Sequence, residues 1–325
     1  MAVRNEARRS SGQSGADIEI IPLPHALGAE VRCGDVRKLD EAGAAAIRQA
    51  FLDHLVLLFR GQKLDDHELM AFGRVFGELA PTIGAKFHAE NVKEFDPALK
   101  HISVVSNVVE NGAAIGALGD GEAAWHTDFS FHEVPPSATL LHSLEIPPVG
   151  GNTGFLNMYL AYDTLPAELK EEIRGRSTKQ DASHNSAGQL RKGFAPVTDV
   201  RTSPGPNHPL IYTHPETGRH SLYLGRRAYA YVNGLSVEQS EALLDKLWAH
   251  TDQPRFAWHH VWKLGDVLVW DNRCTMHHRD AFDPNSRRIM HKTACMGSRP
   301  SEQPGYCPPH PRGAAFAVEN ENSRR

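Results

Sequence analysis

The segment WHTDFSF, residues 125–131, holds the side chains of this sequence that are best suited to bind a metal ion. His126 and Asp128 are two positions apart, and residues i and i+2 of a β-strand point to the same face. One further histidine would complete the two-histidine, one-carboxylate triad that holds Fe(II) and leaves coordination positions open. The simpler interpretation is a strand with two ordinary polar residues, because such pairs are common.

Two histidines nearer the C-terminus are candidates for the third ligand. In GDVLVWDNRCTMHHRD, residues 265–280, an apolar strand is followed by a polar turn and then by His277 and His278. Either imidazole could close the triad, and the spacing does not choose between them. The alternative interpretation is a pair of histidines on a loop that faces solvent.

The segment RRIMHKTACM, residues 287–296, alternates as a strand and places two cations on one face. Arg288 and Lys292 are separated by roughly 13 Å along that face. Two cations that project into a barrel are costly without anionic partners, and the planar guanidinium of arginine suits a carboxylate. The face would therefore serve a dicarboxylate cosubstrate. The alternative is an exposed edge strand with both cations in solvent.

Short strands and a few helices are expected to position these residues. Helical spacing of apolar residues and capping signals predict helices at residues 39–54, 65–77, 164–175 and 236–250. Strands are predicted at residues 55–61, 101–106, 138–144, 153–157, 209–214, 221–225, 256–262, 266–271 and 287–296. Many short strands with covering helices predict a mainly β fold with a double-sheet jelly-roll core. No phosphate-binding glycine motif is present, which argues against a nucleotide-binding α/β fold.

Composition limits the class of protein. The chain has 325 residues, of which 40% are hydrophobic and 23% charged, with a net charge of −4. We predict a single domain over residues 17–300, with mobile tails at 1–16 and 301–325. No basic stripe and no apolar run of membrane-spanning length occur in the sequence, so neither nucleic acid nor a membrane is an expected partner. Four widely spaced cysteines predict free thiols in a reducing, cytoplasmic compartment.

Several motifs occur together, in one order, along the chain. They are VLLFRGQ, WHTDFSF followed closely by PP, GGNTGFLNM with AYDTLP, THPETGR, LVWDNRCTMH and RRIMH. In this combination, over residues 18–298, the sequence resembles the Fe(II)/2-oxoglutarate-dependent dioxygenases of the taurine and 2,4-dichlorophenoxyacetate dioxygenase family. The resemblance implies a double-stranded β-helix (cupin-like) core. It also implies hydroxylation of a small molecule with Fe(II), 2-oxoglutarate and O₂, and release of succinate and CO₂.

The resemblance implies which residues bind the metal. His126 and Asp128 correspond to the H-x-D ligands of the family, and His277, not His278, corresponds to its distal histidine ligand. Halogenases similar to this family carry a small residue in place of the carboxylate. Asp128 therefore favours hydroxylation over halogen transfer.

The resemblance also implies where the cosubstrate and the substrate bind. Arg288 corresponds to the arginine that binds the far carboxylate of 2-oxoglutarate, and Thr153 to the hydroxyl that shares it. Lys292 stands where relatives with sulfonate or carboxylate substrates carry an arginine, which favours an anionic substrate: a carboxylate, a sulfonate or a sulfate ester. The alternative is a lysine that reaches solvent or pairs with a carboxylate. Glu122 and His88 fall in regions that contribute substrate contacts in relatives.

Two other classes of function remain as alternatives. A non-catalytic barrel that binds a metal or ligand as a sensor or store would have no need for Arg288 and Thr153. A zinc hydrolase could use the same three ligands, but no candidate general base adjoins the motif. Members of the family often form dimers or higher oligomers, so a homo-oligomer is possible.

Overall fold

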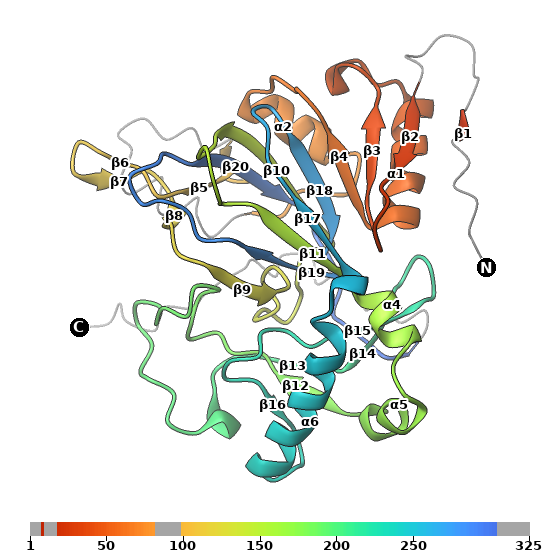
Figure 1. The fold of residues 1–325 in the computed structure, drawn as a ribbon, viewed down its shortest axis with the longest axis vertical. Coiled ribbons are helices and arrows are strands. Elements are labelled where there is room, and N and C mark those ends of the chain that lie inside the picture. Colours follow the sequence, from red (N-terminus) through yellow and green to blue (C-terminus); the bar gives the residue numbers. More distant parts are fainter. Residues whose placement is uncertain (1–7, 10–17, 82–98, 304–325) are drawn as a thin grey trace.

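The computed structural model describes residues 8–9, 18–81 and 99–303, and Figure 1 shows their arrangement. The α-helices of this part are α1 (Glu41–His54), α2 (Asp66–Gly73), α4 (Met158–Asp163), α5 (Ala167–Ile173) and α6 (Val237–Thr251). Short 3-10 helices are η1 (Val36–Lys38), η3 (Val200–Thr202) and η4 (Pro254–Phe256).

The larger sheet has nine strands in the order β1-β2-β3-β4-β18-β10-β20-β5-β8. In that order they are β1 (Arg8–Arg9), β2 (Glu19–Pro22), β3 (Ala29–Arg32), β4 (Val56–Phe59), β18 (Val267–Asp271), β10 (Ala138–Glu145), β20 (Ile289–Ala294), β5 (Ser103–Ser106) and β8 (Ala117–Leu118). The long strand β10 lies between β18 and β20 and pairs antiparallel with both. Both neighbours of β10 therefore come from the C-terminal part of the chain, and the N-terminal strands join the sheet through the pairing of β4 with β18.

The smaller sheet has four antiparallel strands in the order β17-β11-β19-β9. They are β17 (Ala257–His260), β11 (Thr153–Asn157), β19 (Thr275–Arg279) and β9 (Ala123–His126). One buried cluster joins the two sheets, with Leu141 and Trp270 from the larger sheet against Phe155 and Trp258 from the smaller. The two sheets therefore pack face to face, as the predicted jelly roll requires.

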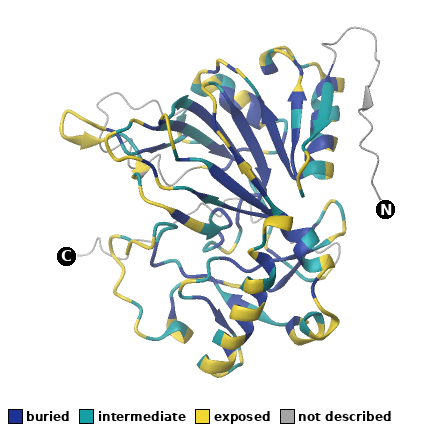
Figure 2. Cartoon of the chain, viewed as in Figure 1, coloured by how far each residue is buried: buried dark blue, intermediate teal, exposed yellow. Residues whose placement is uncertain are grey.

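Helices α1 and α2 cover the outer face of the larger sheet. Ile47 and Phe51 of α1 and Phe72 of α2 belong to a cluster that includes Leu57 and Phe59 of β4. The alternate residues of β4 belong to the cluster between the sheets. Strand β4 is thus buried on both faces, which explains its unbroken apolar run. Figure 2 shows the buried strands between the more exposed surfaces of the helices.

An insertion, residues 158–256, separates β11 from β17 and packs against the smaller sheet. Besides α4, α5 and α6 it contains a three-stranded sheet and a hairpin: β12 (Ser177–Lys179), β13 (Asn207–Pro209), β16 (Tyr231–Val232), β14 (Ile211–Thr213) and β15 (His220–Leu222). A further hairpin precedes β9, formed by β6 (Val109–Glu110) and β7 (Ala113–Ala114). Leu243 and Leu247 of α6 share a buried cluster with Leu156 of β11 and Met276 of β19. The insertion therefore has a core of its own that is anchored on the strands that carry the site.

The predicted helices are confirmed, with ends that differ by one to a few residues. The capping box of Ser236 and Gln239 is present at the start of α6. The helix predicted at 164–175 begins only at Ala167, because Pro166 is its N-cap residue. The segment before it forms α4, which the sequence did not predict. Asn157 caps α4 by accepting a hydrogen bond from the N–H of Leu160.

The predicted tails lie mostly outside the described residues. Arg8 and Arg9 pair with β2, and residues 301–303 contact the insertion, where the N–H of Thr213 on β14 donates to the carbonyl of Ser301. The predicted domain boundaries stay predictions. Cys33, Cys274 and Cys295 are buried free thiols, whereas Cys307 lies outside the described residues. No helix of the described part is both long enough and apolar enough to span a membrane.

Candidate metal centre

The H-x-D segment leaves the smaller sheet at its edge. His126 is the last residue of β9, and Asp128 lies in the turn that follows. The expectation that both belong to one strand was therefore wrong for Asp128. The chain turns because Phe129 has a φ of 51° and the N–H of Ser130 donates to the carbonyl of Thr127. The turn still directs Asp128 toward the inner face on which His126 lies.

His277 lies on β19, directly opposite His126 on the antiparallel strand β9. Opposite residues of neighbouring strands point to the same face, and the two imidazole centroids are 4.2 Å apart. The Nε2 atom of His277 is 3.9 Å from Oδ1 of Asp128. The three side chains offer ligand atoms within 4.8 Å of one another. His278, the next residue, points to the other face and packs against Trp125.

The protonation states of the three groups suit a metal. Burial lowers the pKa of His126 to about 4 and also lowers the pKa of His277. Burial would raise the pKa of Asp128, but the charge of Lys292 and then the two histidines outweigh it and lower that pKa. At neutral pH the site presents two neutral imidazoles and a carboxylate anion, which is the state that metal binding requires. This donor set fits the Fe(II) facial triad.

Neighbouring groups orient the two imidazoles. Nδ1 of His126 lies 2.7 Å from the carbonyl oxygen of Ala124, so Nδ1 carries the hydrogen and Nε2 keeps a free lone pair. The ring of His277 packs against Trp270 and Phe155, with centroid distances of 4.8 and 6.2 Å. Both rings are therefore held by contacts that do not use Nε2.

A chain of hydrogen bonds from the larger sheet orients the carboxylate. The hydroxyl of Thr139, on β10, donates to Oδ2 of Asp128 at 2.9 Å, and the amide of Asn272 donates to that hydroxyl at 2.8 Å. The indole of Trp270 donates in turn to the side-chain Oδ1 of Asn272 at 3.0 Å. Oδ1 of Asp128 thereby faces the imidazoles. The sequence did not single out Thr139, because a threonine in an apolar segment is typical of any strand.

Arg288, immediately before β20, is a buried cation without an acidic partner in the described ranges. Its side chain is 1% exposed, and its Nε has no hydrogen-bond partner there. Burial, and secondly the charge of Arg279, lowers the pKa of Arg288 to about 9, so it stays charged at neutral pH. A buried charge of this kind is costly unless an anion binds to it. A ligand carboxylate would offset the cost through paired hydrogen bonds.

Thr153 follows a segment that lies against Arg288. A side chain at Gly151, two residues before Thr153, would meet Cδ and Nε of Arg288 at 3.3 Å. The hydroxyl of Thr153 accepts a hydrogen bond from the indole of Trp262 at 3.0 Å. Its own hydrogen remains able to donate to an anion. Arg288 and Thr153 thus fit the two-residue carboxylate site that the sequence predicts.

The three predicted substrate residues have different outcomes. Nζ of Lys292 lies 3.1 Å from Oδ1 of Asp128 and 4.9 Å from the ring centroid of Phe129. Its partner is thus a carboxylate, and that carboxylate belongs to the candidate metal site. Glu122 is exposed and lies directly before β9, and His88 lies outside the described residues. The substrate roles of all three stay predictions.

A second buried group, around Asp271, is already satisfied. Asp271 accepts hydrogen bonds from the guanidinium of Arg273 and from Nε2 of His214. Arg273 also pairs with Glu216, and burial raises the pKa of the Cys274 thiol. These contacts fix the turn after β18 and leave no carboxylate oxygen of Asp271 for a metal.

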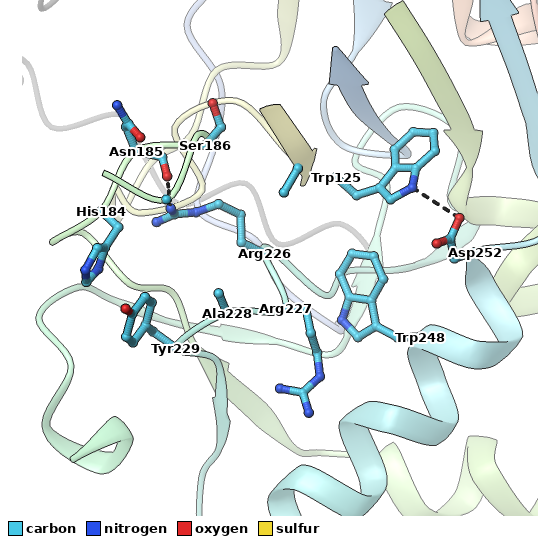
Figure 3. A pocket seen from close by; sticks show the side chains of 12 residues that line it. Trp125, His184, Asn185, Ser186, Arg226, Arg227, Ala228, Tyr229, Trp248 and Asp252 are labelled. Carbon is cyan, nitrogen blue, oxygen red and sulfur yellow. Dashed lines mark hydrogen bonds between the residues drawn. The ribbon is translucent and has the colours of Figure 1, made fainter. Parts of the chain in front are cut away.

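A cleft of about 400 Å³ lies beside β9, on the side of the insertion (Figure 3). Trp125 and Trp248 stand on one side of it, and Tyr229, stacked on His184 at 4.0 Å, stands on the other. The guanidinium of Arg226 is held by two backbone carbonyls and a carboxylate. Trp125 alternates with His126 along β9, so the tryptophan side of the cleft faces away from the triad.

Comparison with known proteins gives consistent results. Residues 19–294 match the model described as Taurine catabolism dioxygenase TauD, TfdA family. The chain is 32% identical over 265 residues to the alpha-ketoglutarate-dependent 2,4-dichlorophenoxyacetate dioxygenase of Burkholderia sp. (strain RASC), covering 80% of this chain and 86% of the relative. It is 32% identical over 289 residues to the (S)-phenoxypropionate/alpha-ketoglutarate-dioxygenase of Sphingobium herbicidovorans, covering 87% and 96%. The solved structure of AAD-2 in complex with Mn(II) and N-oxalylglycine matches with a TM-score of 0.69 and 31% identity, covering 87% and 98%. The match to this structure confirms the predicted mainly β, jelly-roll fold.

Removal of the hydroxyl that orients Asp128 tests the metal centre. We predict that Thr139→Val weakens Fe(II) binding roughly 10- to 100-fold, the usual effect of losing a group that orients a ligand. Anaerobic Fe(II) titration of the full chain measures this. The matched control is Thr293→Val, because the hydroxyl of Thr293 is buried on the neighbouring strand β20 and has no hydrogen-bond partner in the described part. Equal Fe(II) affinities of the two variants would contradict the proposed arrangement.

Proposed function

Because the chain belongs to the Taurine catabolism dioxygenase TauD, TfdA family, we propose that it hydroxylates a small anionic organic molecule with Fe(II), 2-oxoglutarate and O₂. It is an alpha-ketoglutarate-dependent dioxygenase, alpha-ketoglutarate being another name for 2-oxoglutarate. The observation that carries the proposal for this chain is the convergence of His126, Asp128 and His277 on one point.

His126, Asp128 and His277 would hold the iron. When bound there, Fe(II) with 2-oxoglutarate and O₂ supplies the oxidising power that places one oxygen atom on a substrate carbon and the other in succinate, with loss of CO₂. The neutral imidazoles would bind through Nε2 without releasing a proton, and Asp128 would contribute the single negative charge. A carboxylate at position 128 would also take up a coordination position that a halide needs, which favours hydroxylation over halogen transfer.

Arg288 and Thr153 would hold the cosubstrate. Arg288 precedes Lys292 by four residues, which corresponds to roughly 13 Å along the chain. The side chain of Arg288 and the five-carbon 2-oxoglutarate molecule together span the distance from there to the candidate metal ligands near Lys292. The guanidinium pairs with the far carboxylate and the hydroxyl of Thr153 donates to it. A solved structure similar to this chain holds Mn(II) and N-oxalylglycine. N-oxalylglycine is a dicarboxylate that differs from 2-oxoglutarate by an N–H in place of a methylene group.

Lys292 would bind the anionic group of the substrate. Its side chain is largely buried, 12% exposed, and its ammonium contacts the carboxylate of Asp128. Once a divalent metal shares that carboxylate, the ammonium has charge to offer to an incoming anion. The atoms next to that anion then lie near the ligand set, and Phe129 with Phe131, 5.8 Å apart, offers an apolar wall. The names of two relatives refer to phenoxy-substituted carboxylates, which supports a carboxylate.

A turnover assay distinguishes the proposed dioxygenase from a zinc hydrolase and from a metal store or sensor. We expect the full chain, loaded anaerobically with Fe(II) and 2-oxoglutarate, to form succinate on admission of O₂ with an aryloxyalkanoate, sulfonate or alkyl sulfate. His277→Ala should abolish it. If no member of the panel raises succinate formation above the background without substrate, the proposal is wrong. Zinc-supported hydrolysis without O₂ would favour a hydrolase, and metal binding without any turnover would favour a store or sensor.

Neutralisation of Arg288 tests the cosubstrate site. We predict that Arg288→Gln raises the KM for 2-oxoglutarate roughly 10- to 150-fold, because hydrogen bonds to charged groups contribute about 1.5–3 kcal/mol. The matched control is Arg287→Gln. Arg287 is exposed and pairs with Glu145 at 2.7 Å. The KM of this variant for 2-oxoglutarate should therefore stay within about twofold of the original value. An equal change in both variants would show that Arg288 does not bind the cosubstrate.

Neutralisation of Lys292 tests the substrate class. Lys292→Met should raise the KM for an anionic substrate about tenfold or more, while the KM for the corresponding methyl ester changes little. The ratio of the KM change for the acid to that for the ester reports the contact between Lys292 and the substrate anion. An indirect effect through Asp128 would change the KM for acid and ester alike and would cancel in this ratio. The same factor for acid and ester would exclude Lys292 as the anion-binding group.

A further inference from the structure

The outer face of the smaller sheet carries a second set of metal-type ligands, distinct from the triad on the inner face. His259 on β17 and His278 on β19 stand opposite Gly154 on the intervening strand β11. Asp280 follows directly after β19. The ligand atoms of the two histidines and Asp280 lie within 4.8 Å of one another. Strand β17 and the end of strand β19 therefore bring these side chains to one place.

Gly154 makes this convergence possible. Side chains on β17 and β19 start roughly 9–10 Å apart, because a whole strand lies between them. A Cβ at Gly154 would lie 3.0 Å from Cε1 of His259 and closer still to Nε2 of His278, nearer than a side chain allows. The two imidazoles lean over the glycine, with ring centroids 5.2 Å apart. The two imidazoles thus occupy the space above β11 that a side chain at position 154 would fill.

The surroundings of the pair are negatively charged. Nδ1 of His278 lies 3.7 Å from Oδ1 of Asp280. The carboxylates of three acidic residues lie near enough to act electrostatically on His278. They are Asp280, Glu122 and Asp252. Trp125 packs on His278 with a centroid distance of 4.2 Å, and its indole donates to Asp252. One imidazole is therefore fixed by packing within a field that attracts cations, while His259 is exposed and accessible.

We propose that His259, His278 and Asp280 form a second metal site, for a divalent cation such as Zn²⁺. Two imidazoles and a carboxylate are usual zinc ligands, and tetrahedral zinc brings such atoms to roughly 3.3 Å from one another. Small rotations of the accessible His259 and Asp280 side chains close the remaining distance. The ion cross-links β17 and β19 across Gly154. Because β19 also carries His277, occupancy stiffens the sheet behind the catalytic metal centre without touching it.

Zinc stoichiometry tests the site independently of turnover. The full chain and its variants are dialysed against Zn²⁺, and bound metal is measured. His126→Ala removes a ligand of the triad, His259→Gln removes the exposed ligand of the new site, and His25→Gln is the control for loss of an exposed histidine. We expect two equivalents in the original chain and in His25→Gln, one in each of the other variants, and none in the His126→Ala/His259→Gln double variant.

Thermal unfolding provides a second readout. Zn²⁺ should raise the midpoint of His126→Ala, because an ion that binds only the folded state stabilises it. It should leave the midpoint of the double variant unchanged. Asp280→Asn, in the same background, should weaken Zn²⁺ binding and keep the same unfolding midpoint without metal. The proposal is wrong if His126→Ala binds no Zn²⁺, or if the double variant binds Zn²⁺ as tightly as His126→Ala.

Discussion

The register between β9 and β19 is the constraint on which the site depends. His277 stands opposite His126, and side chains alternate between the two faces of a sheet, so a slip by one residue would present His278 in place of His277. The register is fixed by packing on both sides. Phe155 and Trp270 lie against His277 on the inner face, and Trp125 lies against His278 on the outer face. The two adjacent histidines thus have separate surroundings.

The buried carboxylates Asp128 and Asp271 are paired with cations, whereas the buried cation Arg288 is not paired with an acid in the described part. Asp128 is compensated by Lys292, and Asp271 by Arg273, so each buried carboxylate has a cation of its own. Arg288 is the contrasting case, since the described part offers it no acid. The protein therefore tolerates one unfavourable buried charge at the place where a diacid would bind, which is the arrangement expected when a site is prepared in advance for its ligand.

Much of this architecture could be predicted from the sequence, because local rules agree with the fold. The capping box at Ser236 and the apolar strands are short-range signals. The turn at Asp128 was not predicted, because a positive φ is usually signalled by a glycine and position 129 is a phenylalanine. Thr139 was missed because its partner Asp128 lies in the turn after β9, and the sequence does not show that contact. The choice of His277 over His278 came from the family resemblance, and the register gives its physical reason.

Strand β9 lies at the edge of its sheet. On one side it pairs with β19, and on the other the N–H of Ala124 donates to the carbonyl of Ser186 in the insertion. The candidate ligands His126 and His277 thus lie on strands of the sandwich, and Asp128 lies in the turn after β9, while the insertion packs beside them through a buried cluster that it shares with the smaller sheet. The three candidate ligands all lie outside residues 158–256. A change within the insertion would therefore alter what borders the site while the candidate ligands themselves stay in place.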